Sequence, residues 1–384
     1  MYIILLYESK PNDNRKIHKN KDTIIPLSHI TYYYALPSCN YFRTVLIPND
    51  ARIIKQSYYL SWSSLELVNI DDKNILSNKY PIYSINTIKK FNLEITSEYI
   101  TELCDQGLVD ILEWIKNKKG IVDYSELALD LASANGHVHV LEWWYKSGLT
   151  LKYTDKALYW ASNNGHVDVL EWWKKSGLTL EYTSDILDII YNTVNDINLI
   201  MKSLEWWLKS GLELKYTERS LSFTYSVYYN ISQKIYLLEW WVKSDLPLKY
   251  SENLLDLISQ CCCVEILEWW INNNLPFKYT ENALTFNCGS SSDKEIVKAL
   301  NWWVKSNLPL KYTEQSLHLL TTYGYIESLE WWKNSGLTLK YDSQRILTVL
   351  NEICYTGYFP YMVRWWNQFG ITYIIYSNPS FKMF

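Results

Sequence analysis

The sequence predicts a mainly α-helical fold, in which a solenoid of short helical repeats follows a small β-rich or mixed N-terminal cap. Three observations predict it. A Leu-Glu-Trp-Trp block, or a close variant, recurs nine times in the 384 residues. The stretch from each block to the start of the next expected helix has a constant length, as expected where loops set how repeats stack. Residues 1–84 lack glycine and hold five of the ten prolines, so they follow another pattern.

The blocks account for the unusual aromatic content of the chain. They contain 17 of the 19 tryptophans and lie 29 to 34 residues apart. A unit of this length cannot bury a core by itself, so neighbouring units must stack. We expect eight to nine repeats over residues 85–384 and a cap region over residues 1–84. The blocks begin at Leu112, Leu141, Leu170, Leu204, Leu238, Leu267, Leu300, Leu329 and Val363.

The unit that starts at Tyr153 shows how a repeat forms two helices. Thr154 is a good N-cap, because its hydroxyl can accept a free backbone amide, and Asn164-Gly165 is a stop. A second helix follows over residues 167–175, with an apolar stripe that includes Trp172 and Trp173. In long repeats the interval from cap to block grows from 16 to 20 or 21 residues. We expect the added residues in the first helix or in the turn after it, around residues 192–198, 228–234 and 289–293.

Strand-like runs replace this pattern in the cap region. They cover Ile30–Tyr34, Tyr41–Ile47 and Ser57–Trp62, and they are rich in aromatic and β-branched residues. Residues 85–96 are expected to form a degenerate half-repeat that joins the cap to the array.

The stretches Ala134-Asn135-Gly136-His137-Val138 and Asn163-Asn164-Gly165-His166-Val167 resemble ankyrin repeats, with Trp172-Trp173 in place of a Leu-Leu pair. The Trp-rich variant is similar to the ankyrin-repeat families of giant DNA viruses of amoebae. Two features depart from the family: Lys156-Ala157-Leu158-Tyr159 replaces its Thr-Pro-Leu-His tetrapeptide, and the short units lack the length for its β-hairpin finger. The resemblance implies an ankyrin-like solenoid and a non-enzymatic protein–protein interaction scaffold for a host or viral protein, with the helix faces as the binding surface.

The Leu and Trp residues of the blocks are expected to form the repeat core rather than a surface on which ligands stack, because they share a helical stripe. The Glu that follows the block Leu, as in Glu171, is expected to be exposed and to pair with Lys174 or Lys175. The core set is Leu141, Trp143, Trp144, Leu170, Trp172, Trp173, Leu204, Trp206, Trp207, Leu238, Trp240, Trp241, Leu267, Trp269 and Trp270.

A second row of residues precedes each cap, where Tyr recurs in eight repeats and Lys precedes it in six, as in Lys152-Tyr153. Such a row could bind single-stranded nucleic acid through its charge and by stacking. The simpler interpretation packs Tyr as a wedge between repeats with Lys solvated beside it. The net charge of −4 argues against nucleic acid as a partner.

No pattern indicates catalysis, a metal site or a cofactor. His137 and His139 are too close along a helix to point together, and Cys261, Cys262 and Cys263 are expected to be small buried residues. An enzyme with its site in residues 1–84 is a further alternative, but no constellation there supports it. We therefore expect no enzymatic activity, no metal and no cofactor.

The partner-binding surface is expected on the first helices, where the residues differ from repeat to repeat. No signal peptide and no apolar run of membrane-spanning length occur, and the seven cysteines include no metal-binding pair. We therefore expect a monomeric, intracellular, cytoplasmic protein that binds a protein partner and no membrane. The candidate partner-binding residues are Asp155, Lys156, Tyr159, Glu218, Arg219, Glu314 and Gln315.

Overall fold

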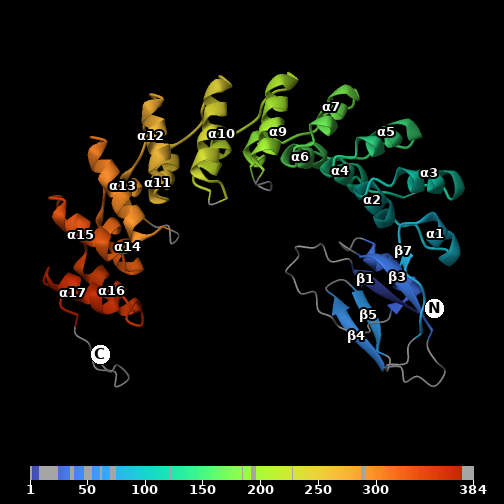
Figure 1. Cartoon of the computed structure of the whole chain (residues 1–384), viewed down its shortest axis with the longest axis horizontal. Coiled ribbons are helices and arrows are strands. Elements are labelled where there is room, and N and C mark those ends of the chain that lie inside the picture. The colour runs from blue at the N-terminus through green and yellow to red at the C-terminus, as the bar shows by residue number, and fades with distance from the viewer. Residues whose placement is uncertain are drawn as a thin grey trace. The chain divides into compact units, whose positions relative to one another are not determined.

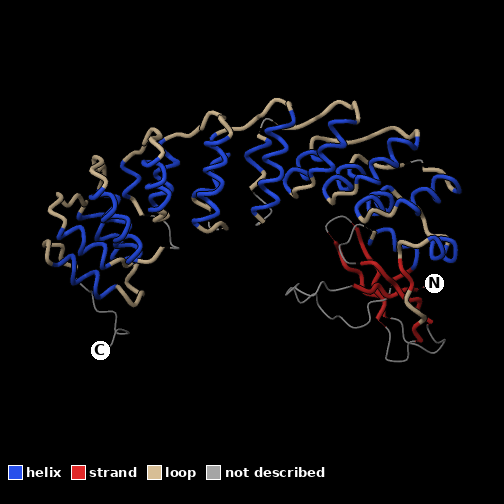
Figure 2. Tube along the Cα trace, turned by 45° about the horizontal axis from the view of Figure 1, so that its top comes forward, coloured by secondary structure: helices blue, strands red, loops and turns tan. Residues whose placement is uncertain are grey.

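The computed structural model describes residues 2–7, 25–34, 39–46, 54–60, 63–69, 75–121, 123–183, 185–191, 196–226, 228–286 and 291–373. The described chain is mainly helical, and all of its described strands precede α1 (Ile85–Phe91) (Figure 1; Figure 2). It divides into two compact units. The first comprises residues 1–183, 192–194 and 198–206, and the second comprises residues 184–191, 195–197 and 207–384. The expected division at residue 84 stays a prediction.

The N-terminal strands form an antiparallel sheet and a separate two-stranded hairpin. In the sheet, β1 (Tyr2–Tyr7) lies between β2 (Ile25–Pro26) and β3 (Cys39–Leu46). Two short strands, β6 (Ile75–Leu76) and β7 (Tyr80–Pro81), pair with different parts of β3. The hairpin consists of β4 (Ile54–Leu60) and β5 (Ser63–Asn69).

The expected strand at Ile30–Tyr34 is wrong, because the chain forms the 3-10 helix η1 (Leu27–Tyr33) there. Tyr34 follows η1 and is fully buried, with its ring centroid 4.8 Å from that of Tyr99 and its hydroxyl donating to the Glu94 carbonyl. These tertiary contacts outweigh the β propensity of the run. The other two runs lie in β3 and β4, and their last residues, at 47 and 61–62, fall outside the described residues.

In the first unit the chain forms helix pairs that follow one another (Figure 1). Each pair is a first helix, a tight turn and a second helix that carries the block. The pairs are α2 (Ser97–Asp105) with α3 (Val109–Lys118), α4 (Leu127–Ala134) with α5 (Val138–Ser147), and α6 (Lys156–Asn163) with α7 (Val167–Lys175).

The pairs continue beyond α7, and the boundary between the two units runs through α9. These further pairs are α8 (Ile186–Ile189) with α9 (Ile197–Ser210), η2 (Glu218–Thr224) with α10 (Ile231–Lys243), α11 (Glu252–Gln260) with α12 (Val264–Asn272), η3 (Glu281–Leu284) with α13 (Asp293–Lys305), α14 (Glu314–Tyr323) with α15 (Ile326–Asn334), and α16 (Ser343–Glu352) with α17 (Phe359–Asn367).

Within the described residues no helix is both long enough and apolar enough to cross a membrane.

In three of the four long repeats the added residues lie mainly in the second helix, which corrects the expectation that they lie in the first helix or in the turn after it. In the fourth, they lie in the turn between α16 and α17, as expected. In short repeats the second helix starts three residues before the block Leu, as Val167 does before Leu170. The helices α9, α10 and α13 start seven residues before it, so each gains about one turn. The first helices of these repeats shrink to a short α8 or to 3-10 turns. Residues 192–195 and 289–290 fall outside the described residues.

The core of the array contains the block Leu and the second Trp of each pair. Leu141, Leu170, Leu204, Leu238 and Leu267 are fully buried, as are Trp144, Trp173, Trp207, Trp241 and Trp270. Among the first tryptophans, Trp172, Trp206 and Trp240 are buried, whereas Trp143 and Trp269 are only half-buried. The first Trp of the pair faces the edge of the stack, next to the exposed side chain of a block Glu.

Candidate binding surface

Several of the buried second tryptophans donate a hydrogen bond to the first-helix segment of the preceding repeat. The Nε1 of Trp173 donates to Ser133 Oγ at 2.9 Å, and that of Trp303 donates to Ser259 Oγ at 2.8 Å. Trp144, Trp241 and Trp366 donate to Cys104, Tyr191 and Thr321 in the same way. Each of these five acceptors stands eight residues after the cap of its own repeat, so the same helix position supplies the acceptor at every one of these steps.

In several blocks the first Trp donates to the acid of the preceding block, a hydrogen bond that we call a rung. Trp143, Trp172 and Trp206 donate from Nε1 to Glu113, Glu142 and Glu171 at 2.6, 2.6 and 3.0 Å. Asn301 replaces the acid in the rung to Trp331. The expected Lys pairing of the acids also occurs, as between Lys175 and Glu171 at 3.0 Å. The rung from Trp206 is the main cause, with Lys175 second, that lowers the pKa of Glu171.

The Tyr–Lys row is a clamp between consecutive repeats. Tyr124 packs against Trp144 of the next repeat with ring centroids 4.6 Å apart, and its hydroxyl donates to the Thr150 carbonyl at 2.6 Å. Lys152 then donates to the Tyr124 carbonyl at 2.9 Å, with its Nζ 4.5 Å from the Tyr124 ring centroid. Tyr is therefore the expected wedge, but Lys is bonded rather than merely solvated. Three further pairs repeat the clamp: Tyr216 with Lys249, Tyr279 with Lys311, and Tyr312 with Lys340.

The turns between helices hold further contacts that link repeats. Asp130 is fully buried and accepts from both the N–H and the hydroxyl of Thr154, the cap of the next repeat. His137 and His139 each contact a backbone carbonyl of the preceding repeat at 2.9 Å. No group of three or more His, Cys, Asp and Glu within the described ranges could hold a metal ion. We call the rungs, the clamps and these contacts the frame.

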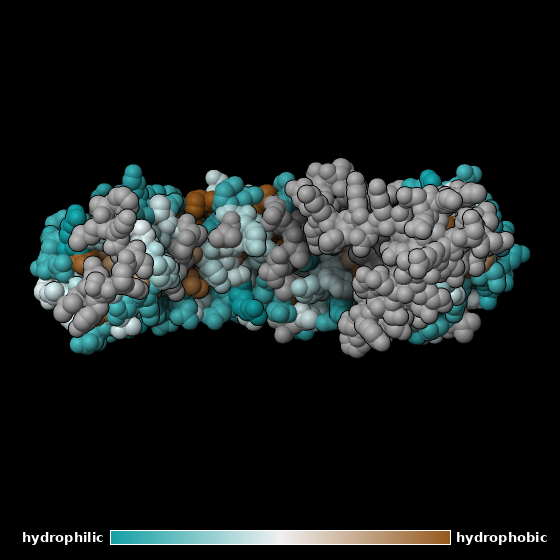
Figure 3. All heavy atoms as spheres, turned by 90° about the horizontal axis from the view of Figure 1, so that it is seen from below, coloured by the Kyte–Doolittle hydropathy of each residue, from teal (hydrophilic) through white to brown (hydrophobic). Residues whose placement is uncertain are grey.

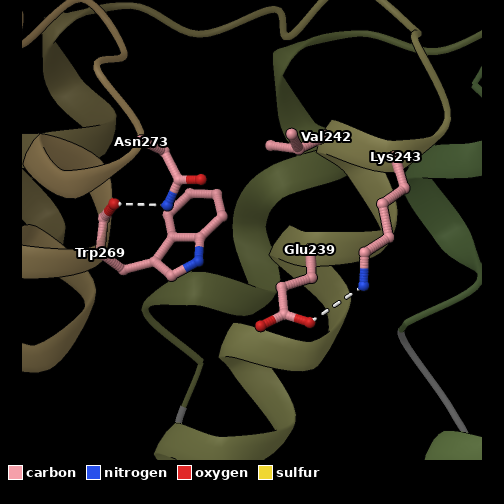
Figure 4. A pocket seen from close by; sticks show the side chains of 5 residues that line it. All are labelled: Glu239, Val242, Lys243, Trp269 and Asn273. Carbon is pink, nitrogen blue, oxygen red and sulfur yellow. Dashed lines mark hydrogen bonds and ion pairs between the residues drawn. The ribbon is translucent and has the colours of Figure 1, made fainter.

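Among the described residues the rungs from Trp269, Trp302 and Trp365 are open, and a cavity of 440 Å³ lies at the first of these steps, between Trp269 and Glu239 (Figure 4). It is lined by Glu239, Val242 and Lys243 of α10 and by Trp269 and Asn273 at the end of α12. The indole N–H of Trp269 and the carboxylate of Glu239 face the same space without a hydrogen bond between them (Figure 4). Glu239 instead accepts from Lys243 at 3.3 Å, and Asn273 donates to the Trp269 carbonyl at 2.8 Å. The cavity therefore presents a free donor and a charged acceptor side by side.

Exposed aliphatic residues follow the open rung along the array. Val242, Ile271 and Val304 occupy the same position of three successive second helices and are 39%, 38% and 50% exposed. Short repeats place Lys174 and Lys333 at this position, where a charge is readily solvated. Sequence reasoning missed this row, although an apolar residue directly after the Trp pair is the signal that could have found it. The row and the open cavity are the candidate binding surface.

The residues expected to bind a partner lie at the starts of first helices. Asp155 and Tyr159 are half-buried and Lys156 is exposed at the start of α6. Glu218 and Arg219 are exposed in the first turn of η2, and Glu314 and Gln315 begin α14. The first three of these residues belong to one unit and the other four to the second, where they lie on two different repeats. Hydrophilic residues dominate the described surface on the face in Figure 3, and hydrophobic ones appear there as small patches.

Comparisons with known proteins give no family. No family model matches the sequence, and no curated protein matches it. Two solved structures are similar: the pentatricopeptide repeat protein PPR10 and a triple Cys-to-Ser variant of it, each in complex with an 18-nt psaJ RNA element. In both cases the identity is 10%, the match covers 73% of this chain and 49% of the other, and the TM-score is 0.31. The match thus spans about half the length of those proteins.

Both solved structures are RNA complexes. The expectation that the net negative charge makes nucleic acid an unlikely partner is wrong for a reason that lies in this chain itself. Net charge sums over the whole chain, whereas a nucleic acid meets a local row of charges. Such a row exists, because Lys249, Lys278, Lys311 and Lys340 are exposed at one position of four successive repeats. A likeness with a TM-score of 0.31 nevertheless assigns no ligand to this chain.

Proposed function

We propose that the chain is a non-enzymatic helical-repeat scaffold that binds a protein partner. The observation that carries the proposal is the cavity at the open rung between Glu239 and Trp269, where an indole N–H and a carboxylate are not bonded to each other. Frame residues are committed to stacking, so a partner must use the positions left over. The resemblance to ankyrin repeats, which implies protein binding, supports the same function.

The cavity favours an extended peptide segment that carries an amide group and an aliphatic side chain. An amide accepts from an indole N–H and donates to a carboxylate, so it can complete the open rung. The rung from Trp331 to Asn301 shows that an amide oxygen suits the indole in this array. Val242, Ile271 and Val304 then offer apolar surface to the aliphatic side chain.

Selection of peptides against the full chain tests the proposal. A displayed library of random peptides is panned on the immobilised protein, and the enriched peptides are titrated by fluorescence anisotropy. We expect Val242→Asp to weaken their binding at least tenfold. The control Tyr145→Asp changes the same helix position beside the closed rung of Trp172 and should leave binding unchanged. Loss on Arg219→Glu but not on Val242→Asp would assign binding to the first helices instead.

Single-stranded nucleic acid is the second candidate, favoured by the exposed row of Lys249, Lys278, Lys311 and Lys340. Regularly spaced cations can follow a phosphate backbone, whereas the tyrosine hydroxyls of the row bond the frame. Anisotropy of a labelled oligonucleotide at several salt concentrations tests it. Binding that weakens steeply with salt and on Lys278→Gln would favour this candidate. Lys278 is the best choice because it lies over the Tyr250 ring at 5.4 Å without a clamp hydrogen bond.

A further inference from the structure

A buried lysine faces a buried cysteine between two consecutive repeats. The Nζ of Lys234 in α10 lies 3.7 Å from the Sγ of Cys263. The two residues are 4% and 8% exposed. Among the described residues Lys234 has no carboxylate partner, although a buried ammonium without a counter-charge is costly. The sulfur of Cys263 is thus the hydrogen-bond acceptor for this ammonium.

Two features of the surroundings of Cys263 stabilise negative charge on its sulfur, although the thiol also donates to the Cys261 carbonyl at 3.6 Å. Cys263 is the N-cap of α12, a helix of nine residues, and a helix N-terminus stabilises negative charge. The adjacent ammonium of Lys234 also stabilises negative charge on the sulfur. The thiolate is the reactive form of cysteine. Cys261, Cys262 and Cys263 are all free of disulfides. The sequence analysis predicted only small buried residues at this place. It could not pair Cys263 with Lys234, because the two residues lie 29 positions apart in the sequence.

We propose that Cys263 and Lys234 form a site that reacts with hydrogen peroxide and closes a reversible sulfur–nitrogen bond between the two repeats. In the first step the thiolate of Cys263 attacks one peroxide oxygen, and the O–O bond breaks. The ammonium of Lys234 gives a proton to the departing hydroxide, which leaves as water. The products are a sulfenic acid and a neutral amine. The sulfur loses two electrons, and the peroxide gains them.

In the second step the neutral amine of Lys234 attacks the sulfur of the sulfenic acid. The S–O bond breaks, and the hydroxyl leaves as water with one of the amine protons. The result is a sulfenamide that joins α10 to the start of α12. A thiol reductant reverses it by attacking the sulfur and releasing the amine. This chemistry is independent of the proposed binding function.

Peptide mapping of the full chain after treatment with hydrogen peroxide tests the proposal. We expect a cross-linked pair of peptides that contains Lys234 and Cys263 and is two hydrogen atoms lighter than their sum. Trypsin should fail to cleave after Lys234, and dithiothreitol should release the pair. Cys104 is the internal control, because burial raises the pKa of its thiol to about 12 and should keep it unmodified.

Variants separate this bond from a disulfide within the cysteine triplet. The cross-link should persist in Cys261→Ser/Cys262→Ser. In Lys234→Gln it should be absent, and labelling of Cys263 by dimedone during peroxide treatment should slow at least tenfold. Circular dichroism reports whether Lys234→Gln folds, and the wild-type map decides the matter if it does not. A map that shows Cys263 oxidised beside unmodified Lys234, or joined only to another cysteine, would overturn the proposal.

Discussion

Buried indole N–H groups need acceptors, and this chain supplies them from the preceding repeat. Leaving a buried donor unpaired costs about 1–3 kcal/mol, so each acceptor makes one repeat depend on its neighbour. Ser133 and Ser259 do this for Trp173 and Trp303. Within the described ranges, Trp270 and Trp332 have no partner for Nε1, so the ladder is incomplete at those steps.

Removal of a hydroxyl that is hydrogen-bonded should therefore lower the free energy of unfolding far more than removal of an unpaired one. Ser259 accepts from Trp303 and donates to the Ala283 carbonyl at 2.6 Å. We expect Ser259→Ala to lower the free energy of unfolding by about 1–3 kcal/mol. Ser316→Ala is the matched control, because Ser316 is fully buried and its hydroxyl has no partner in the part of the chain that the structure describes. Denaturant unfolding compares them, and equal losses would contradict the expectation.

The rung from Trp206 to Glu171 predicts a dependence on pH. The rung and Lys175 lower the pKa of Glu171, so the folded state prefers the carboxylate. Such a group stabilises the fold above its unfolded pKa, and this contribution disappears as the pH falls through the folded pKa. Trp206→Phe should raise the pKa of Glu171 toward its ordinary value and should weaken the loss of stability in acid. Carboxyl NMR titration measures this, and Lys175→Met, which removes the second cause of the lowered pKa, is the variant for comparison. An unchanged pKa in Trp206→Phe would refute the rung.

At the scale of the helix, three of the long repeats keep the block in place and extend the second helix backwards. Two of these helices carry a capping box, formed by Asn230 with Gln233 and by Ser292 with Glu295. These boxes stabilise the added turn by pairing free amides at its start. The extra residues therefore change the start of the second helix without disturbing the stack.

Removal of one cap should weaken the added turn of α13. Ser292→Ala should cost about 1 kcal/mol, because Ser292 accepts from the Glu295 amide and its own amide donates to the Glu295 carboxylate. Ser343→Ala is the control, because Ser343 starts α16 beside the true cap, Asp342. Amide exchange at the start of α13 should speed up only in Ser292→Ala. If exchange there stays the same, the cap does not hold the turn.

Two glycines test how tightly the turns pack. Gly324 has φ +78°, and a Cβ there would lie 2.5 Å from Cγ of Tyr358. Gly336 has φ +76° but nothing within 4 Å of its Cβ position. Gly336→Ala should therefore cost only about 1–2 kcal/mol for the left-handed backbone. Gly324→Ala should cost distinctly more, because the Tyr358 ring must move as well. Thermal unfolding compares the two, and equal costs would show that this turn is loosely packed.

The periodic blocks made the helix pairs predictable, since one apolar stripe and one cap recur in each repeat. The added turns were assigned to the wrong helix, because length alone does not say which helix grows. The capping boxes at Asn230 and Ser292 were readable in the sequence and could have decided it. The rungs were not predictable, because Glu142 and Trp172 lie 30 positions apart and only stacking joins them. The same holds for the cavity, which exists where one such pair fails to meet.

At the scale of the whole molecule, the proposed function assigns stability and binding to different residues. The frame links each repeat mainly to its neighbours, as expected for a linear array of repeats. The positions left over include Val242, Ile271 and Val304 beside the open rung. Substitutions in the frame should therefore act on unfolding, and substitutions at the left-over positions should act on binding.

The indole N–H resonance of Trp269 tests the central claim most directly. It is assigned in the full chain by its loss in Trp269→Phe, and the enriched peptides are then added to the wild-type protein. We predict that this resonance shifts on binding, because the peptide completes the open rung. The resonance of Trp172, whose rung is closed at 2.6 Å, should stay in place. Saturating peptide that leaves the Trp269 resonance unmoved would contradict the claim that the open rung is the binding point.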